Sequence, residues 1–181
     1  MRIPAATYRI QFSAAFRFAD AQAIAAYLAD LGVSDLYASP IFKARSGSTH
    51  GYDVVDATQL NPELGTVEEF QALTNTLQNL GLGWLQDIVP NHMAYSSENA
   101  FLMDVLEHGP DSDYADYFDL CWNSPFANSR DRILVPLLGN FYGASLENGE
   151  IQLHYDQSGL SVNYYSLKLP LRLESYPKVL T

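Results

Sequence analysis

The sequence predicts an α/β protein, because strand-like and helix-like segments alternate through its first half. Three short runs rich in β-branched and aromatic residues are separated by two segments whose apolar residues recur at helical spacing. Each helical segment ends at a glycine, a residue that commonly follows a helix. Alternation of this kind is typical of parallel sheets whose strands are joined by helices.

The first strand is predicted at residues 5–11 and the second at residues 33–39. The helix between them is expected to begin at residues 19–20, with Asp20 as its N-cap, and to end before Gly32. Its apolar face follows from spacings of three and four residues and comprises Ile24, Tyr27, Leu28 and Leu31. A strand, a helix and a second strand in this order predict a parallel crossover connection.

Residues 40–65 are expected to form a long loop without regular secondary structure. Loops of this length are usually functional or disordered, and this one carries histidine, tyrosine and aspartate in place of linker residues. A second helix is predicted to follow, because Thr66 and Glu69 form a capping-box pattern. Its apolar stripe comprises Phe70, Leu73, Leu77 and Leu80.

Residues 83–92 are predicted to contain the third strand, buried on both faces because apolar residues dominate and alternation is weak. Pro90 cannot donate a backbone hydrogen bond to a neighbouring strand, so the strand is expected to end there. Its C-terminal end then presents Asp87, Asn91 and His92. Sites in β/α proteins lie at the carboxyl ends of the strands, which makes these three side chains candidates.

The second half of the chain is richer in tyrosine, asparagine, proline and glycine, and helical periodicity largely disappears from it. One short helix is expected at residues 99–106, and strands at residues 133–136, 151–155 and 160–165. Three strands and two helices cannot close an eight-stranded barrel. The alternatives are a small open α/β domain, or the first three β/α units of a TIM (β/α)8 barrel with an inserted domain beginning after strand 3. The irregular second half favours the barrel, with residues 1–93 as its N-terminal part and residues 94–181 as the start of the insertion.

The composition of the chain argues against some kinds of binding partner and favours others. The formal net charge of −11 and the absence of a basic stripe argue against nucleic acid. The sequence has no apolar run of the roughly 18 residues that a membrane span needs. A single cysteine is typical of a reducing, cytoplasmic compartment. Aromatic residues make up 13% of the chain, which suits carbohydrate because sugar rings stack on aromatic faces.

The candidate residues after the third strand have both functional and structural readings. His92 can donate a hydrogen bond to a ligand hydroxyl, and Asp87 can hold a neighbouring cation in place. Asn91 offers a carbonyl that faces a calcium ion or ties down its own loop. The alternative is a simple turn with a satisfied carboxylate. No Cys/His spacing supports a zinc site and no glycine-rich phosphate loop is present, so we expect no metal or cofactor.

The predicted long loop carries a second candidate set. Tyr52 can stack on a sugar ring, and Gly51 allows the backbone to approach a ligand closely. Asp53 can cap the loop or bind hydroxyl groups, and His50 lies beside them in the sequence. Clusters of aspartate and glycine are more often turn chemistry, so both readings stay open here.

Several motifs together resemble the maltooligosyltrehalose synthase family, a branch of the α-amylase superfamily, along essentially the whole chain. They are the sequences at residues 6–12, 37–40, 47–54, 61–65, 87–93, 104–109 and 137–139. The aspartate, asparagine and histidine of Asp87-x-x-x-Asn91-His92 alone indicate only the superfamily. Together with the Ser-Thr-His-Gly-Tyr-Asp-Val motif at residues 48–54 and the Glu-His-Gly-Pro motif at residues 107–110, they are specific to this branch.

The resemblance implies an intramolecular transglucosylation without a cofactor, in which the reducing-end α-1,4 linkage of a maltooligosaccharide becomes α,α-1,1. Tyr52 would stack under the sugar at the cleavage point and His92 would bind its hydroxyls, with Asp53 and His50 in the loop wall. Asp87 would orient an arginine beside the nucleophile. Asn91 matches a calcium-ligand position of many amylases, although this branch gives no reason to expect the ion.

In this family the three catalytic carboxylates come from strands beyond the third, so the resemblance implies no catalytic residue in this chain. We therefore expect an N-terminal fragment that binds maltooligosaccharide, an α-1,4-glucan, and is catalytically silent by itself. Uncovered barrel surface would favour self-association of such a fragment. The alternatives are a related α-glucan hydrolase and a non-catalytic glucan-binding module.

Overall fold

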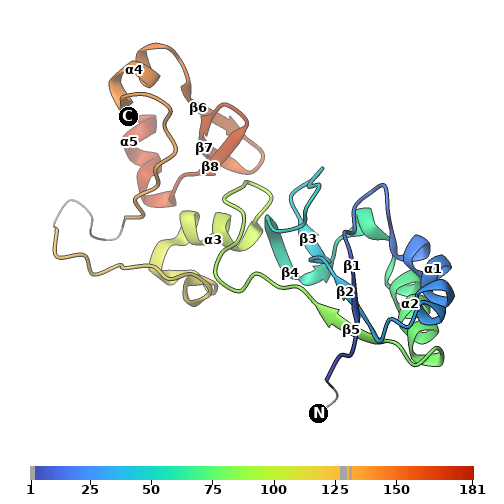
Figure 1. Ribbon diagram of the computed structural model, residues 1–181. Coiled ribbons are helices and arrows are strands. Elements are labelled where there is room, and N and C mark those ends of the chain that lie inside the picture. Colours follow the sequence, from blue (N-terminus) through green and yellow to red (C-terminus); the bar gives the residue numbers. More distant parts are fainter. Residues whose placement is uncertain (1–2, 127–129, 131) are drawn as a thin grey trace. The chain divides into compact units, whose positions relative to one another are not determined.

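The computed structural model describes residues 3–126, 130 and 132–181. The chain forms two compact units, Met1–Ala94 and Tyr95–Thr181 (Figure 1). None of the helices in the described part is long and apolar enough to cross a membrane.

The first unit is built on a parallel sheet of three short strands, as predicted. They are β1 (Thr7–Ile10), β2 (Asp35–Ala38) and β5 (Gly83–Gln86), in the order β1-β2-β5. Helix α1 (Phe18–Asp30) connects β1 to β2, and helix α2 (Val67–Asn79) precedes β5 (Figure 1). The predicted parallel connection between the first two strands is confirmed.

The two faces of this sheet differ in chemistry. Opposed residues in a parallel sheet point to the same side, so alternate positions separate the faces. Ile10, Ala38 and Leu36 belong to the core with residues of both helices. The other face carries Arg9 paired with Tyr37, and Tyr37 paired with Leu85, which is 37% exposed. The prediction that β5 is buried on both faces is therefore wrong, because α1 and α2 pack on one side of the sheet (Figure 1).

Helix α1 begins one to two residues earlier than predicted, and its inward face matches the predicted one only in part. Leu28 is buried and Ile24 packs against the core, as predicted. Arg17 occupies the N-cap position, and Asp20, the predicted N-cap, lies at N3, where its carboxylate accepts a 2.8 Å hydrogen bond from the Arg17 backbone N–H. Tyr27 and Leu31 are 64% and 58% exposed. The buried face consists of Phe18, Ala21, Ala25 and Leu28. Small alanines let the helix approach the sheet closely, which hydrophobicity and spacing alone do not indicate.

Helix α2 follows the prediction closely. The Glu69 carboxylate accepts a 2.7 Å hydrogen bond from the Thr66 N–H, and the Thr66 hydroxyl accepts one of 3.2 Å from the Glu69 N–H. Leu73 and Leu77 are buried in the core. Gly81 adopts a φ of 72° just after the helix, a conformation that favours glycine.

The segment predicted as an irregular loop at residues 40–65 instead contains regular structure. Strand β3 (Phe42–Ala44) pairs antiparallel with β4 (Val54–Leu60), and a 3-10 turn, η1 (Pro62–Leu64), follows. Thr58 and Gln59 of β4 are polar and exposed, and the pairing has register shifts. A short, irregular hairpin with a polar strand lacks the apolar alternation by which strands are predicted.

The second unit combines short helices with an antiparallel sheet. Its helices are α3 (Ala100–His108), α4 (Tyr142–Glu147) and α5 (Tyr176–Leu180), and its 3-10 turns are η2 (Gly109–Asp111), η3 (Ala115–Tyr117) and η5 (Leu173–Ser175). Its strands are β6 (Ile151–Asp156), β7 (Gly159–Tyr164) and β8 (Leu167–Pro170), paired in that order. The predicted helix and the predicted hairpin of β6 and β7 are confirmed, whereas β8, α4 and α5 were not predicted.

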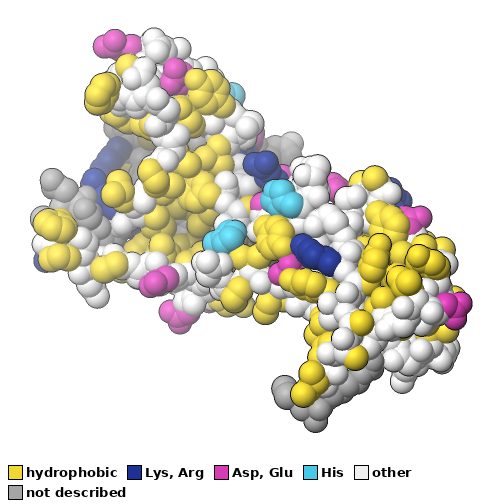
Figure 2. Space-filling model, in the orientation of Figure 1, with side chains coloured by type: hydrophobic (Ala, Val, Ile, Leu, Met, Phe, Trp, Pro, Cys, Tyr) yellow, Lys and Arg dark blue, Asp and Glu magenta, His cyan; other side chains and the backbone are white. Residues whose placement is uncertain are grey.

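One predicted strand of the second unit is absent among the described residues. Residues 133–136 are without regular structure, and Leu134 is 94% exposed. Leu134 lines an open apolar cavity of about 660 Å³, together with residues that include Leu106, Leu153 and Val162. Figure 2 shows hydrophobic side chains gathered on this unit. High strand propensity does not make a strand where no neighbouring strand offers hydrogen bonds.

Candidate functional site at the ends of the parallel strands

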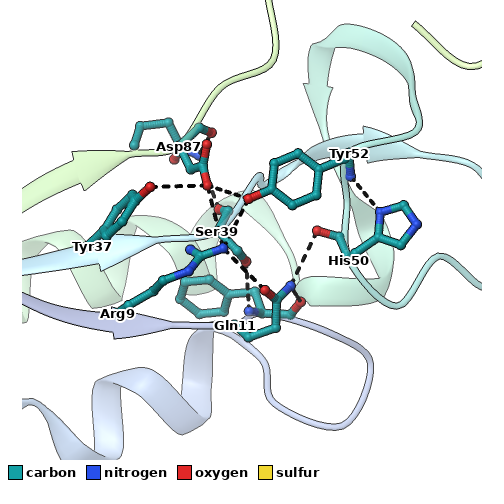
Figure 3. A network of polar contacts seen from close by, with 9 residues as sticks. Arg9, Gln11, Tyr37, Ser39, His50, Tyr52 and Asp87 are labelled. Carbon is teal, nitrogen blue, oxygen red and sulfur yellow. Dashed lines mark hydrogen bonds and ion pairs between the residues drawn. The ribbon is translucent and has the colours of Figure 1, made fainter.

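Asp87 is the centre of a polar cluster at the carboxyl end of the sheet (Figure 3). Its Oδ2 accepts hydrogen bonds from the Tyr52 hydroxyl at 2.6 Å and from the Tyr37 hydroxyl at 3.3 Å. The same oxygen lies 3.5 Å from Arg9 Nη2 in an ion pair. We call Arg9, Tyr37, Tyr52 and Asp87 the Asp87 cluster. Its members come from all three parallel strands or their ends, and from the segment that precedes β4.

The strand register explains why these side chains meet. Arg9 and Tyr37 are directly paired across β1 and β2 and therefore share a face of the sheet. Asp87 directly follows β5, and its N–H donates a 2.9 Å hydrogen bond to the Ala38 carbonyl. Parallel strands end at one edge, so a residue just past β5 comes close to the last residues of its neighbours. The Asp87 side chain is 16% exposed, so its charge is partly shielded from water.

Tyr52 is fixed at its hydroxyl by two groups. Arg9 Nη2 donates to the Tyr52 Oη at 3.1 Å, and that hydroxyl donates onward to Asp87. The hydrogen bond to Asp87, together with desolvation and the carboxylate charge, raises the pKa of Tyr52 above its usual value of 10.0. The phenol is therefore neutral at physiological pH and its oxygen is engaged with protein groups.

The backbone around Tyr52 is held by contacts within the protein. Gly51 has a φ of 78°, and a Cβ at this position would lie 2.8 Å from the carbonyl oxygen of Pro40. The glycine is thus required by a close approach to Pro40 rather than to a ligand. Gln11 Nε2 donates a 3.3 Å hydrogen bond to the His50 carbonyl, which ties this segment to the end of β1 (Figure 3).

His50 and Asp53 support the same segment. The Tyr52 N–H donates a 3.0 Å hydrogen bond to His50 Nδ1. Its ring is stacked on Tyr52, with centroids 6.0 Å apart. Asp53 accepts a hydrogen bond from the Ser48 hydroxyl and lies 3.8 Å from Arg45 Nε. The structure therefore gives Asp53 the loop-capping contacts that were one of its two predicted roles.

Asn91 and His92 lie outside the hydrogen bonds of the Asp87 cluster within the described residues. Both are exposed, and His92 Nδ1 lies 3.1 Å from Asn91 Oδ1. The segment that carries them is nevertheless attached nearby, because the Ala94 N–H donates a 2.8 Å hydrogen bond to the Val54 carbonyl. His92 lies two residues before Ala94, and Tyr52 lies two residues before Val54. The two side chains thus belong to neighbouring segments.

Sequence reasoning missed Arg9, Gln11 and Tyr37. The available signal was the pattern of the first strand, in which Arg9 and Gln11 alternate with the buried Ile10. A cation in a strand of an acidic chain indicates a buried or half-buried carboxylate partner. For metals, the described residues contain no group of three or more His, Cys, Asp or Glu side chains placed to hold an ion.

Comparisons with known proteins identify the family. The family model described as "Alpha amylase, catalytic domain" matches residues 22–159. A "Putative maltooligosyl trehalose synthase" of Mycobacterium tuberculosis (strain ATCC 25618 / H37Rv) is 44% identical over 141 residues, which are 74% of this chain and 18% of the relative. A cyclomaltodextrinase of Geobacillus thermopakistaniensis is 37% identical over 94 residues, 52% of this chain and 15% of that protein.

Solved structures agree with the sequence matches. A crystal structure of a maltooligosyl trehalose synthase has a TM-score of 0.83 and 42% identity, covering 93% of this chain and 22% of that chain. The maltooligosyltrehalose synthase from Arthrobacter ramosus gives 0.81 and 36%, covering 95% and 22%. The chain thus spans about a fifth of the length of these proteins, and the predicted resemblance to them is confirmed. The fold is of the TIM-barrel type, and the chain belongs to the α-amylase catalytic-domain family.

Proposed function

We propose that this chain is the glucan-binding N-terminal part of a maltooligosyltrehalose-forming enzyme. The complete enzyme would convert the reducing-end α-1,4 linkage of a maltooligosaccharide to an α,α-1,1 linkage. The observation that carries the proposal is the Asp87 cluster, which presents the Tyr52 ring at the strand ends of a chain 44% identical to a maltooligosyl trehalose synthase.

The two units take distinct places in this proposal. The first unit provides the first three β/α units of the (β/α)8 barrel, supported by the parallel order β1-β2-β5 and by α1 and α2 on one face. The second unit is the beginning of the domain inserted after the third barrel strand. Its antiparallel sheet and short helices support this, because they do not continue the β/α alternation.

The binding roles follow the chemistry of each side chain. Tyr52 stacks under the glucose unit at the cleavage point through its ring, because its hydroxyl is already engaged with Arg9 and Asp87. His92 donates a hydrogen bond to a sugar hydroxyl from an exposed position. His50 and Asp53 form the loop wall behind Tyr52. Asp87 acts through its neighbours, and the arginine that it contacts among the described residues is Arg9.

The chemistry is that of a retaining glycosidase acting as an isomerase. An aspartate nucleophile forms a glycosyl-enzyme while a glutamate protonates the leaving oxygen, and a further aspartate stabilises the charge that develops. The anomeric hydroxyl of the departing glucose then attacks in place of water, so no net hydrolysis occurs. In the family these carboxylates come from strands beyond the third, so the proposal expects no turnover from the 181 residues alone. Their task is to hold the sugar and keep water away from it.

A graft tests this function. The 181 residues would replace the matching segment of the M. tuberculosis relative, and the chimera would be incubated with maltopentaose. The proposal expects non-reducing products ending in trehalose, and their loss in the chimera carrying Tyr52→Ala. A folded chimera, judged by circular dichroism, that releases glucose or leaves maltopentaose unchanged would contradict the proposal. The isolated chain should bind maltopentaose in calorimetry without altering it.

A related α-glucan hydrolase is the second candidate, and the 37% identity to a cyclomaltodextrinase favours it over a module without catalysis. The same graft separates the two, because a hydrolase segment yields reducing ends. We further propose a cytoplasmic location, from the single cysteine, and no role in nucleic-acid binding, from the net charge of −11.

Self-association of the isolated chain is part of the proposal. Strands β1 and β5 are the outer strands of the described sheet, and Leu85 on the face opposite the helices is 37% exposed. Unpaired strand edges and exposed apolar faces favour association. Light scattering should therefore show dimers or larger species at high concentration, and a monomer throughout would refute this part.

A further inference from the structure

The geometry points to Arg9 as a positioning residue for glucan binding, which holds Tyr52 in its binding orientation through the Asp87 cluster. This inference rests on the proposed function, because it assumes that the Tyr52 ring receives a sugar. Arg9 lies on β1, whereas the site residues predicted from the sequence all lie in the segments that follow β2 and β5.

The contacts of the Arg9 guanidinium support this role. Its Nη2 lies 3.1 Å from Tyr52 Oη, 3.5 Å from Asp87 Oδ2 and 3.4 Å from Gln11 Oε1. Its Cζ lies 4.9 Å from the centre of the Tyr37 ring, within the range of a cation–π contact. One side chain thus touches three strand ends and the segment of Tyr52 (Figure 3).

The direction of the hydrogen bonds means that Arg9 determines the orientation of the Tyr52 hydroxyl. A guanidinium only donates, so the Tyr52 oxygen must accept from Arg9 and give its own proton to Asp87. This relay fixes the torsion of the hydroxyl and the position of its oxygen. Gln11, which contacts Arg9, also donates to the His50 carbonyl and so couples the backbone before Tyr52 to the same group.

Charge gives Arg9 a second effect within the cluster. Asp87 is a carboxylate with a side chain 16% exposed, and Arg9 is the cation in contact with it. Without that cation, a half-buried carboxylate next to two phenols draws in water or moves toward solvent. Either movement would break the 2.6 Å bond that holds Tyr52.

Removing Arg9 should shift the Tyr52 pKa in opposite directions, depending on whether Arg9 positions Tyr52 or only contributes its charge. The charge of Arg9 lowers the pKa of Tyr52, whereas the hydrogen bond to Asp87 raises it by more. If Arg9 positions Tyr52, its loss breaks the bond to Asp87 and the Tyr52 pKa falls toward its ordinary value. If the bond survives without Arg9, losing the positive charge raises the Tyr52 pKa further.

The test uses the 181-residue chain as wild type, Arg9→Met and Arg9→Lys. Calorimetry gives the Kd for maltopentaose, and NMR of tyrosine labelled with ¹³C at Cζ follows ionisation of Tyr52, assigned with Tyr52→Phe. Arg17→Met serves as the matched control, because it removes one positive charge at the start of α1, away from the cluster. Should Arg9→Met not fold, the same measurements are made on Arg9→Gln.

We expect Arg9→Met to weaken maltopentaose binding about tenfold and to lower the Tyr52 pKa, with Arg9→Lys recovering part of both. The control should bind like wild type. A change in Kd of less than threefold, or a rise in the Tyr52 pKa, overturns the inference. If the wild-type chain does not bind maltopentaose, the proposed function fails, and the pKa measurement alone still decides whether Arg9 positions the phenol.

Discussion

The hydrogen bond between Tyr52 and Asp87 predicts a measurable energetic coupling. Tyr52→Phe removes the donor and leaves the ring, and Asp87→Asn removes the charge and leaves a side chain of the same shape. A double-mutant cycle with both changes isolates the interaction from the other effects of each substitution.

Geometry sets the size of this coupling. The oxygen–oxygen distance is 2.6 Å, short for a neutral pair and usual for a hydroxyl bound to a carboxylate. Hydrogen bonds to charged groups contribute about 1.5–3 kcal/mol to stability. The Asp87 side chain is 16% exposed, so solvent screening takes away only part of this. We expect a coupling free energy of about 1–2 kcal/mol.

Urea unfolding followed by circular dichroism measures the four free energies of unfolding. Tyr37→Phe provides the matched control, because the Tyr37 hydroxyl reaches the same Asp87 oxygen at the longer distance of 3.3 Å. Its coupling to Asp87→Asn should be clearly smaller. A Tyr52–Asp87 coupling below about 0.3 kcal/mol, or one no larger than that of Tyr37, would refute the reasoning.

Three further substitutions test other parts of the structure. Phe18→Ala should cost about 3–5 kcal/mol in urea unfolding, because the ring is 0% exposed in the core. Gly51→Ala should lower the free energy of unfolding by about 1–3 kcal/mol and weaken maltopentaose binding, because φ is 78° and the added Cβ would lie too close to the Pro40 carbonyl oxygen. An unchanged free energy of unfolding would contradict this turn geometry. The Lys168 ammonium, which donates to Asp156, and the Ser158 groups hold the Asp156 pKa well below 3.8. A carboxyl group whose pKa is lower in the folded protein than in the unfolded chain stabilises the fold at pH values above the unfolded pKa. Asp156→Asn should therefore lower the Tm at pH 7, and the difference in Tm from wild type should shrink as the pH falls below 4.

The parts of the fold that local chemistry determines were predictable from the sequence. The capping box of Thr66 and Glu69 and the glycine after α2 act within a few residues, so the limits of that helix follow from the sequence alone. The β3–β4 hairpin was missed because β4 carries polar residues at Asp56, Thr58 and Gln59 and lacks apolar alternation, so its strands are recognisable only by their pairing. Residues 133–136 show the opposite case: this apolar run was predicted as a strand, but it pairs with no other strand in the described part of the chain, and Leu134 is exposed.

The site divides in the same way. Tyr52 and Asp87 were predicted because each stands in a recognisable motif at a strand end or in the segment before β4. Arg9 was not, because its alternation with Ile10 shows only that it lies on the other face of β1. Its place beside Tyr52 and Asp87 depends on the register that pairs it with Tyr37, which the sequence does not give. The roles of His92 and Asn91 in binding stay predictions, since their contacts with a sugar need a ligand to form.

The most direct test of the account is an NMR titration of the ¹⁵N-labelled chain with maltopentaose. The account predicts chemical-shift changes concentrated at residues 9–11, 50–53 and 87–92, the segments that carry the Asp87 cluster and its neighbours. Tyr52→Ala should abolish them. Shifts confined to other parts of the chain, or no shifts at millimolar maltopentaose, would contradict the claim that this cluster presents Tyr52 to a glucan.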